Sequence, residues 1–171
     1  MKILIFSDSH GDLERARNIL QYIGSKIDMV FHLGDYASDA MDLEKEFPSI
    51  VFHYVQGNCD YEAGVPDHKI VRTGGKAFLL THGHKQGVHW NLDHIAYWAE
   101  EQGADAVLFG HTHRAFCDDH GRVMLFNPGS ISLPRDTEIP TFGILTIENG
   151  ILQGSVMEYW NERTFRPRMR Y

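Results

Sequence analysis

The sequence predicts an α/β fold that mixes parallel and antiparallel strands. Three observations carry this prediction. Short, unbroken apolar runs alternate with helical patterns through the first half of the chain, five apolar runs end beside Asp, Asn or His, and further apolar runs follow one another closely near the C-terminus. Unbroken apolar runs are typical of buried parallel strands, and closely spaced strands joined by turn signals are typical of antiparallel ones.

The first half of the chain has the order strand, helix, strand, helix, strand. The strands are predicted at residues 3–6, 29–33 and 50–55. The helices show apolar residues every three or four positions, at Leu13, Ala16, Leu20 and Ile23, and at Ala40, Leu43 and Phe47. Asp12 is predicted to cap the first helix and Gly24 to end it, whereas Pro48 stops the second. This order predicts a parallel sheet with helices packed on it.

The second half of the chain predicts a helix and several strands. The strands are expected at residues 76–80, 106–109, 123–126, 142–147 and 151–159. The helix carries apolar residues at Leu92, Ile95, Ala96 and Ala99 and ends before Gly103. Asn149-Gly150 lies between the last two strands and is a strong hairpin signal, so these strands are expected to be antiparallel.

Length and composition predict one domain, residues 1–171, of a cytoplasmic protein. The chain is 43% hydrophobic and 23% charged, which is typical of a folded protein. Its apolar runs are too short for a membrane helix or a signal peptide, so we expect no membrane partner. Two cysteines, Cys59 and Cys117, are too few for a disulfide framework or a thiolate zinc site.

The charge of the chain is acidic except at its C-terminus. The formal net charge is −7, which makes a long nucleic acid an unlikely partner. Residues 162–171 instead hold four Arg and one Glu. This segment is either a solvated, frayed tail or an arm that docks on something.

Polar side chains follow five of the predicted strands. These short segments are Ser7-Asp8-Ser9-His10, Gly34-Asp35, Gly57-Asn58-Cys59-Asp60, Thr81-His82-Gly83-His84 and Gly110-His111-Thr112-His113. In open α/β sheets the ligand site lies beyond the carboxyl ends of the strands, so these residues are expected to converge. The adjoining glycines let the backbone turn sharply or approach closely.

Seven of these residues are candidate metal ligands with oxygen or nitrogen donors. They are Asp8, His10, Asp35, Asn58, His82, His111 and His113. Such a set suits Mn, Fe, Co, Ni or Zn. Seven ligands exceed the need of one ion but fill two when one carboxylate bridges them. Asp35 is predicted as the bridge, because a carboxylate has two oxygens and its strand is expected near the centre of the sheet.

The ordered set of motifs resembles the calcineurin-like metallophosphoesterases. That signature runs D-x-H, G-D, G-N-H-[DE], H and G-H-x-H, and the chain matches its order and spacing from residue 1 to about residue 135. Asn127-Pro128-Gly129-Ser130, followed by Pro134-Arg135, is similar to the small YfcE-type phosphodiesterase subgroup. Each motif alone also occurs as an ordinary helix cap or turn, but the five motifs in this order are specific to the family.

The resemblance implies a four-layer αββα sandwich and two sets of metal ligands. The first metal would be held by Asp8, His10, Asp35 and His113. The second would be held by Asp35, Asn58, His82 and His111. The implied cofactors are two divalent ions, foremost Mn²⁺, with Ni²⁺, Fe, Co²⁺ or Zn²⁺ as alternatives. Small members of the family are often oligomers, so the resemblance also makes a homo-oligomer an expectation.

One position departs from the family pattern. The family usually carries His after the motif Asn, whereas this chain carries Cys59. A thiol with a pKa near ~8.5 is a weaker proton donor at neutral pH than an imidazolium. The YfcE-type members also carry Cys here, which implies phosphodiesterase more than phosphatase activity. His84 or Asp60 is an alternative proton donor, and the sequence leaves this choice open.

The predicted function is a metal-dependent phosphodiesterase that hydrolyses a small phosphodiester by attack of a metal-bridging hydroxide. Asn58, Cys59, Asp60 and His84 are the candidate catalytic residues beside the ligands. A phosphomonoesterase is one alternative. A catalytically weak interaction scaffold is the other, because the retromer small subunit is similar in fold with a degraded site. The remaining histidines are assigned no role in the site, and Asn127 and Ser130 are expected mainly to form a turn.

Overall fold

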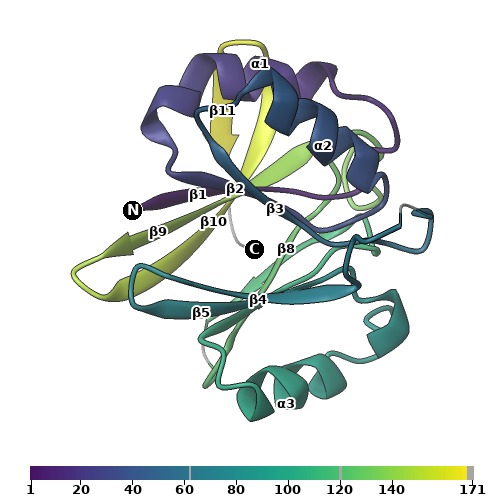
Figure 1. Cartoon of the computed structure of the whole chain (residues 1–171), viewed down its shortest axis with the longest axis vertical. Coiled ribbons are helices and arrows are strands. Elements are labelled where there is room, and N and C mark those ends of the chain that lie inside the picture. Colours follow the sequence, from purple (N-terminus) through teal and green to yellow (C-terminus); the bar gives the residue numbers. More distant parts are fainter. Residues whose placement is uncertain (62, 120, 169–171) are drawn as a thin grey trace.

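Two β-sheets pack face to face in the computed structural model, with helices on the outer face of each (Figure 1). Residues 1–61, 63–119 and 121–168 are described. Helices α1 (Glu14–Ile23) and α2 (Ala37–Glu46) cover one sheet, and α3 (Asp93–Glu101) covers the other. Two short 3₁₀ turns, η1 (Gly24–Lys26) and η2 (His84–Gln86), follow α1 and β5. The predicted αββα layers are therefore confirmed.

The first sheet has six strands in the order β11-β10-β9-β1-β2-β3. Its strands are β1 (Lys2–Phe6), β2 (Met29–His32), β3 (Val51–Tyr54), β9 (Thr141–Glu148), β10 (Ile151–Asn161) and β11 (Thr164–Pro167). The strands β1, β2 and β3 are parallel, and β9, β10 and β11 continue the sheet antiparallel. The turn between β9 and β10 uses the left-handed φ angles of Asn149 (52°) and Gly150 (78°), which confirms the predicted hairpin.

The second sheet has five strands in the order β4-β5-β6-β8-β7. Its strands are β4 (His68–Thr73), β5 (Lys76–Thr81), β6 (Ala106–Leu108), β7 (Ala115–Asp118) and β8 (Met124–Pro128). The central strands β5, β6 and β8 are parallel, and the edge strands β4 and β7 are antiparallel to their neighbours. Parallel and antiparallel pairs thus occur in both sheets.

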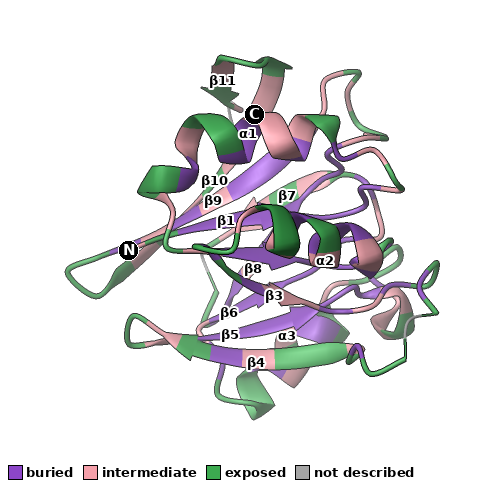
Figure 2. Cartoon of the chain, turned by 45° about the horizontal axis from the view of Figure 1, so that its top comes forward, coloured by how far each residue is buried: buried purple, intermediate pink, exposed green. Residues whose placement is uncertain are grey.

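Strand alternation explains why both faces of the central strands are buried (Figure 2). In β1, Ile3 and Ile5 point into the core between the sheets, whereas Leu4 and Phe6 point toward α1. In β5, Phe78 and Leu80 face the same inter-sheet core, and Leu79 faces α3. Each fully buried side chain of this size contributes roughly 1.5–3 kcal/mol. The unbroken apolar runs therefore reflect strands covered on both sides.

The structure corrects several sequence predictions. It adds β4, β11 and most of β7, which carry polar residues that hide the strand pattern. Strand β2 lies next to the edge strand β3 and is not central. Asp12 accepts a hydrogen bond from the Glu14 amide, but Leu13 occupies the cap position of α1.

The C-terminal segment, residues 162–171, is an arm and not a frayed tail over its described part. Within it, β11 pairs with β10, and Arg168 forms an ion pair with Asp136 at 2.9 Å. Residues 169–171 lie outside the described part of the chain. None of the helices in the described ranges is long and apolar enough to cross a membrane.

Candidate metal centre

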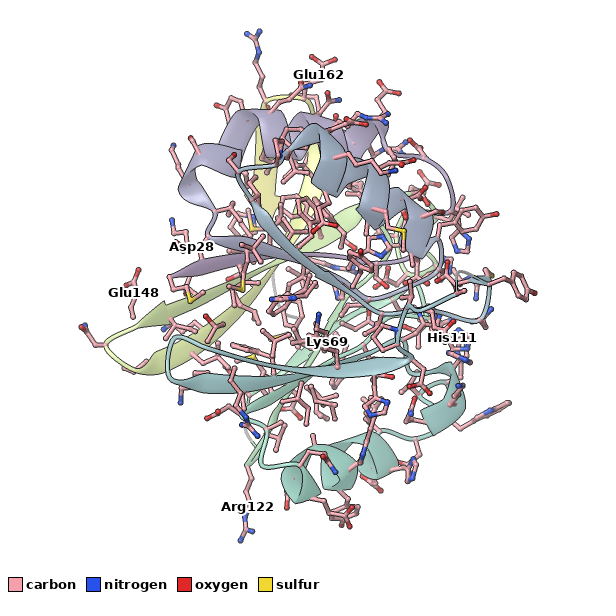
Figure 3. All side chains as sticks on the ribbon, viewed as in Figure 1. Asp28, Lys69, His111, Arg122, Glu148 and Glu162 are labelled. Carbon is pink, nitrogen blue, oxygen red and sulfur yellow. The ribbon has the colours of Figure 1, made fainter. Side chains whose placement is uncertain are left out.

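The five polar segments meet at one end of the sandwich, although they follow strands of two different sheets. The His82 ring, after β5, donates from Nδ1 to the carbonyl of Leu33, after β2, at 2.8 Å. The amide of Gly110, after β6, donates to the His82 carbonyl at 3.1 Å. Figure 3 shows His111 at the edge of the molecule where the two sheets end. The predicted convergence therefore occurs between two sheets and not along one.

Glycines allow this close approach of the segments. A Cβ at Gly34 would lie 2.6 Å from the amide nitrogen of Gly57. A Cβ at Gly57 would overlap the Asp35 carboxylate, and one at Gly110 would overlap the Ser7 hydroxyl. Any larger residue would force the loops apart.

Four candidate ligands form the first cluster: Asp8, His10, Asp35 and His113. One ligand atom from each lies within 4.8 Å of all the others. His10 Nε2 lies 3.2 Å from His113 Nε2 and 3.7 Å from Asp35 Oδ2. His113 Nε2 lies 3.3 Å from Asp8 Oδ1. Two imidazoles and two carboxylates therefore point at one small volume.

The second cluster comprises Asn58, His82 and His111, beside the other oxygen of Asp35. His82 Nε2 lies 3.3 Å from Asp35 Oδ1 and 3.2 Å from Asn58 Oδ1. The His111 ring centroid lies 5.1 Å from that of His82. Asn58 is exposed, and His111 is half-buried, so this cluster faces solvent more than the first. All seven predicted ligands thus lie together.

Backbone carbonyls orient two of the imidazoles. His82 Nδ1 donates to Leu33 at 2.8 Å, and His113 Nδ1 donates to Leu133 at 2.7 Å. Because Nδ1 carries the proton in both rings, Nε2 presents its lone pair to the cluster in the neutral form. This is the arrangement in which histidine binds a metal, with its second nitrogen held by an outer hydrogen bond.

The buried charges already favour cations at these positions. Burial opposes ionisation of Asp35, but the neighbouring His82 outweighs this effect and holds the pKa of Asp35 well below its usual range. Burial lowers the pKa of His82, but Asp35 and Asp8 raise it above its ordinary value overall. The pKa of His113 is raised in the same way by Asp8 against burial. Either a proton or a metal ion satisfies this need for positive charge.

The other two histidines at this end favour the neutral form. Burial, with the neighbouring His82 and His89, lowers the pKa of His111 to about 4. Burial and His82 also lower the pKa of His84. His111 is therefore uncharged at neutral pH, as a metal ligand must be.

One carboxylate oxygen of Asp8 indicates that the site fits a metal ion. Asp8 Oδ1 is inaccessible and accepts no hydrogen bond from the described residues. Nε2 of His113 lies 3.3 Å from this oxygen, and Nε2 of His82 lies 4.0 Å from it. Buried carboxylate oxygens are costly unless paired, and a bound cation would pair this one. The donor set therefore fits divalent metal ions.

Backbone strain concentrates at the same residues. Seven non-glycine residues in the described ranges have positive φ, and five are candidate ligands: Asp8, His10, Asp35, His111 and His113. Left-handed conformations cost such residues roughly 1–2 kcal/mol each. Strain of this kind clusters at sites where the surrounding fold must hold side chains in place. The surrounding fold therefore imposes these backbone conformations, which the residues do not favour by themselves.

Asp60 holds the loops together and does not face the ligands. Its Oδ1 accepts hydrogen bonds from the amides of Tyr36 (2.8 Å) and Ala37 (2.7 Å), at the start of α2. Its Oδ2 accepts one from Gly57 at 2.7 Å. Both oxygens of this carboxylate are thus engaged as acceptors of backbone N–H groups. The geometry therefore assigns Asp60 to positioning, and not to the proton donation considered for it.

Cys59 lies at the exposed mouth of the site. Its amide donates to Asp35 Oδ1 at 3.0 Å, and the Asn58 side chain donates to its sulfur at 3.3 Å. Partial burial and the Asp35 charge raise the pKa of the Cys59 thiol to about 11. The thiol is therefore protonated at neutral pH but is a weak acid there.

A buried chain of hydrogen bonds connects the backbone segments that carry the first cluster. The Gly34 amide donates to His32 Nδ1, so His32 Nε2 donates to Ser9 Oγ at 3.0 Å. Ser9 Oγ donates in turn to Asp39 Oδ2 at 2.7 Å, which also accepts from the Gly11 amide. These contacts join the segments that carry Asp8, His10 and Asp35. His32 carries no motif signal, so the sequence predicts no role for it in the site.

Other supporting residues have a partial sequence signal. Ser130 and Ser132 both donate to the Asp8 carbonyl, and Asn127 donates to the Gly110 carbonyl. The Asn127-to-Ser130 motif therefore braces two loops of the site besides making a turn. The His89 ring lies 4.5 Å from the His111 ring, and no motif could have indicated this contact.

Residues 1–150, which make up most of the chain, match the calcineurin-like phosphoesterase superfamily domain. The chain belongs to this superfamily. A Bacillus subtilis (strain 168) relative named "Probable metallophosphoesterase YsnB" is 37% identical over 87% of this chain and 86% of its own length. Phosphodiesterase YfcE of Escherichia coli K12 is 27% identical over 89% of this chain and 90% of its own.

A solved structure of this superfamily shares the fold. A Streptococcus pneumoniae TIGR4 protein described as a predicted phosphoesterase superposes with a TM-score of 0.79 at 28% identity. The match covers 98% of this chain and 97% of that one. The resemblance in motifs is therefore confirmed as family membership, and the metallophosphoesterase fold carries a cluster suited to divalent metal ions.

Proposed function

We propose that this phosphoesterase is a two-metal phosphodiesterase. The observation that carries the proposal is the position of Asp35 between the clusters. Its Oδ2 lies 3.7 Å from His10, and its Oδ1 lies 3.3 Å from His82. One carboxylate thus offers an oxygen to each side, as a bridging ligand must. Asp8, His10 and His113 would complete one metal site, and Asn58, His82 and His111 the other.

The donor set favours first-row divalent ions, and we propose Mn²⁺ foremost. Carboxylate, amide and imidazole donors without thiolate suit Mn²⁺, Fe²⁺, Co²⁺, Ni²⁺ or Zn²⁺. Two such ions add +4 to the formal net charge of −7 and bring it to −3. The acidic balance of the chain is then partly a property of its site.

The residues of the chain set the geometry in which water attacks the phosphorus atom. When bound, two divalent ions lower the pKa of a water and offset charge on the phosphoryl oxygens. The carbonyls of Leu33 and Leu133 fix the orientation of His82 and His113. The strained segments are braced by Asp60 and Ser130, so little reorganisation is needed when substrate enters.

A diester is the proposed substrate because the site offers no strong acid at neutral pH. Cys59 stands where the family usually has histidine, and a thiol is a weaker proton donor at neutral pH than an imidazolium. His84 has a lowered pKa, and the carboxylate of Asp60 accepts three amides. The phosphodiesterase name of the YfcE relative supports the same choice. We also propose a small substrate and one domain over residues 1–171.

The test compares bis(p-nitrophenyl) phosphate with p-nitrophenyl phosphate. The protein is stripped with chelator, and each divalent metal is added back singly while bound metal per chain is measured. The expected result is metal-dependent cleavage of the diester in excess of the monoester, with two ions bound. Asp35→Asn should lose both turnover and the second ion.

Two outcomes would redirect the proposal. Equal or faster cleavage of the monoester would favour a phosphatase, and the argument from Cys59 would be wrong. Absence of turnover with every metal, together with low metal content, would favour the scaffold alternative. Asp42→Asn serves as a matched control, because Asp42 is exposed on α2 and pairs with Lys45 away from the ligands.

A further inference from the structure

A pocket of about 350 Å³ lies beside the second cluster. It opens between the segment that leads into α3 and the segment from Thr112 to Phe116. Its lining includes Val88, His89, Leu92, Phe109, Arg114 and Phe116. The His89 ring contacts the His111 ring at 4.5 Å, and Thr112 follows His111 directly. The pocket is therefore separated from a proposed metal ligand by a single side chain.

The floor of the pocket is apolar and rigidly built. Val88 and Phe109 are buried, with 5% and 1% of their surfaces exposed. Val88 packs against Gly83, where an added Cβ would lie 2.9 Å from the valine methyl and where φ is +95°. Gly83 lies between His82 and His84, so the same turn orients a proposed ligand and the pocket floor.

The polar wall is held in place by hydrogen bonds. Thr112 Oγ1 accepts from the Asn127 side chain at 3.0 Å and from the Arg114 amide at 3.2 Å. Asp136 Oδ2 accepts from the Ala115 amide and from Arg168 of the C-terminal arm, both at 2.9 Å. The charge of Asp136 is thereby offset by Arg168, so this wall does not repel an anionic ligand.

We infer that this pocket binds a flat aromatic group, of nucleobase size, carried by the phosphoester substrate. The exposed ring of Phe116 and the guanidinium of Arg114 can stack on such a group, over the apolar floor. The volume is within the range of small-molecule sites, and its mixture of apolar surface with a few polar groups is typical of them. The inference deepens the proposed function, since it assigns a substrate class to the same site.

The test measures binding and does not depend on turnover. Adenosine 5′-monophosphate and ribose 5-phosphate are titrated into the Mn²⁺-loaded protein by calorimetry. They share a sugar phosphate and differ in the base. We expect the nucleotide to bind at least roughly tenfold more tightly, as burial of one aromatic ring predicts. Equal affinities, or no detectable binding of the nucleotide, would overturn the inference.

Variants locate the preference in the pocket. Phe116→Ala and Arg114→Ala should each bring the two affinities closer to equality. Arg114 is exposed, so its variant should fold even if the strand variant does not. Tyr97→Ala is the matched control, because Tyr97 is 66% exposed on α3 and does not line the pocket. Retention of the preference in both pocket variants would contradict the assignment.

A kinetic comparison separates this inference from the proposed function. The p-nitrophenyl esters of thymidine 5′-monophosphate and of methyl phosphate release the same leaving group. A lower KM for the thymidine ester, lost in Phe116→Ala, supports the pocket. Turnover of both esters with equal KM would contradict the assignment of the pocket and support the phosphodiesterase activity. Binding that depends on the base, without turnover of either ester, would support the assignment of the pocket and contradict the phosphodiesterase activity.

Discussion

The two clusters of the metal centre differ in how firmly the fold holds them. The first cluster, Asp8, His10, Asp35 and His113, places one ligand atom of each residue within 4.8 Å of the others. Three of these residues are buried. In the second cluster His82 is buried, but Asn58 is exposed and His111 is half-buried. The first cluster thus has a compact, shielded arrangement, and the second has an open one.

This difference separates metal retention from substrate access. A buried and oriented ligand set binds tightly because little ordering remains to be done on binding. An open set leaves room for a substrate oxygen on the exposed ion. We therefore expect the first metal to bind more tightly and the second to exchange more readily. The pocket lies on the open side, next to His111.

The sharpest test removes one histidine from each cluster. His113→Ala should lower kcat/KM by about 10³-fold, because the tightly held ion is lost. His111→Ala should lower it by about 10²-fold and be partly rescued by excess metal. Steady-state kinetics measure these losses, and calorimetric metal titration of the stripped protein follows the ions, with two binding steps in the parent. Loss of the same step in both variants would remove the distinction between the clusters.

Asp60 should contribute to stability, because it joins the loop before Asn58 to the start of α2. Asp60→Ala leaves the amides of Tyr36, Ala37 and Gly57 without their acceptor, and we expect a loss of about 2–4 kcal/mol in unfolding free energy. Urea denaturation of the chelator-treated protein measures it. Asp42→Ala is the control, because Asp42 forms an exposed ion pair with Lys45, and its loss should cost under about 0.5 kcal/mol. A similar loss in both variants would contradict the bracing role.

Cys59 offers a test of specificity at the open cluster. Cys59→His places an imidazole where the family pattern usually has one. We expect monoester cleavage to rise roughly tenfold, less than the ~10²–10⁴-fold of a fully positioned acid, while diester cleavage changes less. Steady-state rates on the two p-nitrophenyl substrates measure the ratio. Cys59→Ser controls for loss of the thiol, and an unchanged ratio in the histidine variant would remove Cys59 as a determinant.

The smallest expected effect is the pH dependence of the unfolding free energy that His32 contributes. Burial lowers the pKa of His32, so the folded protein keeps this ring neutral. Below pH ~6.5 the unfolded chain gains a proton that the folded chain does not, and stability falls as pH decreases. One such group contributes at most about 1.4 kcal/mol per pH unit.

His32→Gln should therefore flatten the acid-side slope of unfolding free energy in chelator-treated protein. Other groups set the remainder of the slope. The lowered pKa values of His53, His84 and His111 act in the same direction, and the raised values of His82 and His113 act in the opposite one. Urea denaturation between pH 7 and 5 measures the slope. Gln153→Asn, at an exposed position of β10, is the control and should leave the slope unchanged.

The elements that could be predicted from sequence are those with a strong local pattern. The runs at 3–6 and 29–33 are buried on both faces, and Asn149-Gly150 adopts the backbone that its turn requires. Strand β4 escaped prediction because its residues are mostly polar or exposed at a sheet edge. Strand β11 escaped because it has four residues, and Arg166 and Pro167 among them hide the strand pattern.

The sequence by itself determined which chemical groups the site would hold. Asp, Asn and His after five strands predict an oxygen and nitrogen donor set, and their order predicts the family. Residue type and spacing are sufficient for this, since ligand chemistry is a property of side chains and strand ends are visible in hydrophobic pattern.

Only the tertiary structure decided how these groups are arranged. It placed the strand ends in two facing sheets, turned five candidate ligands into left-handed backbone, and gave Asp60 and His32 supporting roles. Each of these results depends on contacts between segments far apart in the chain. Local propensity opposes the strained backbone, and packing across the two sheets overrides it.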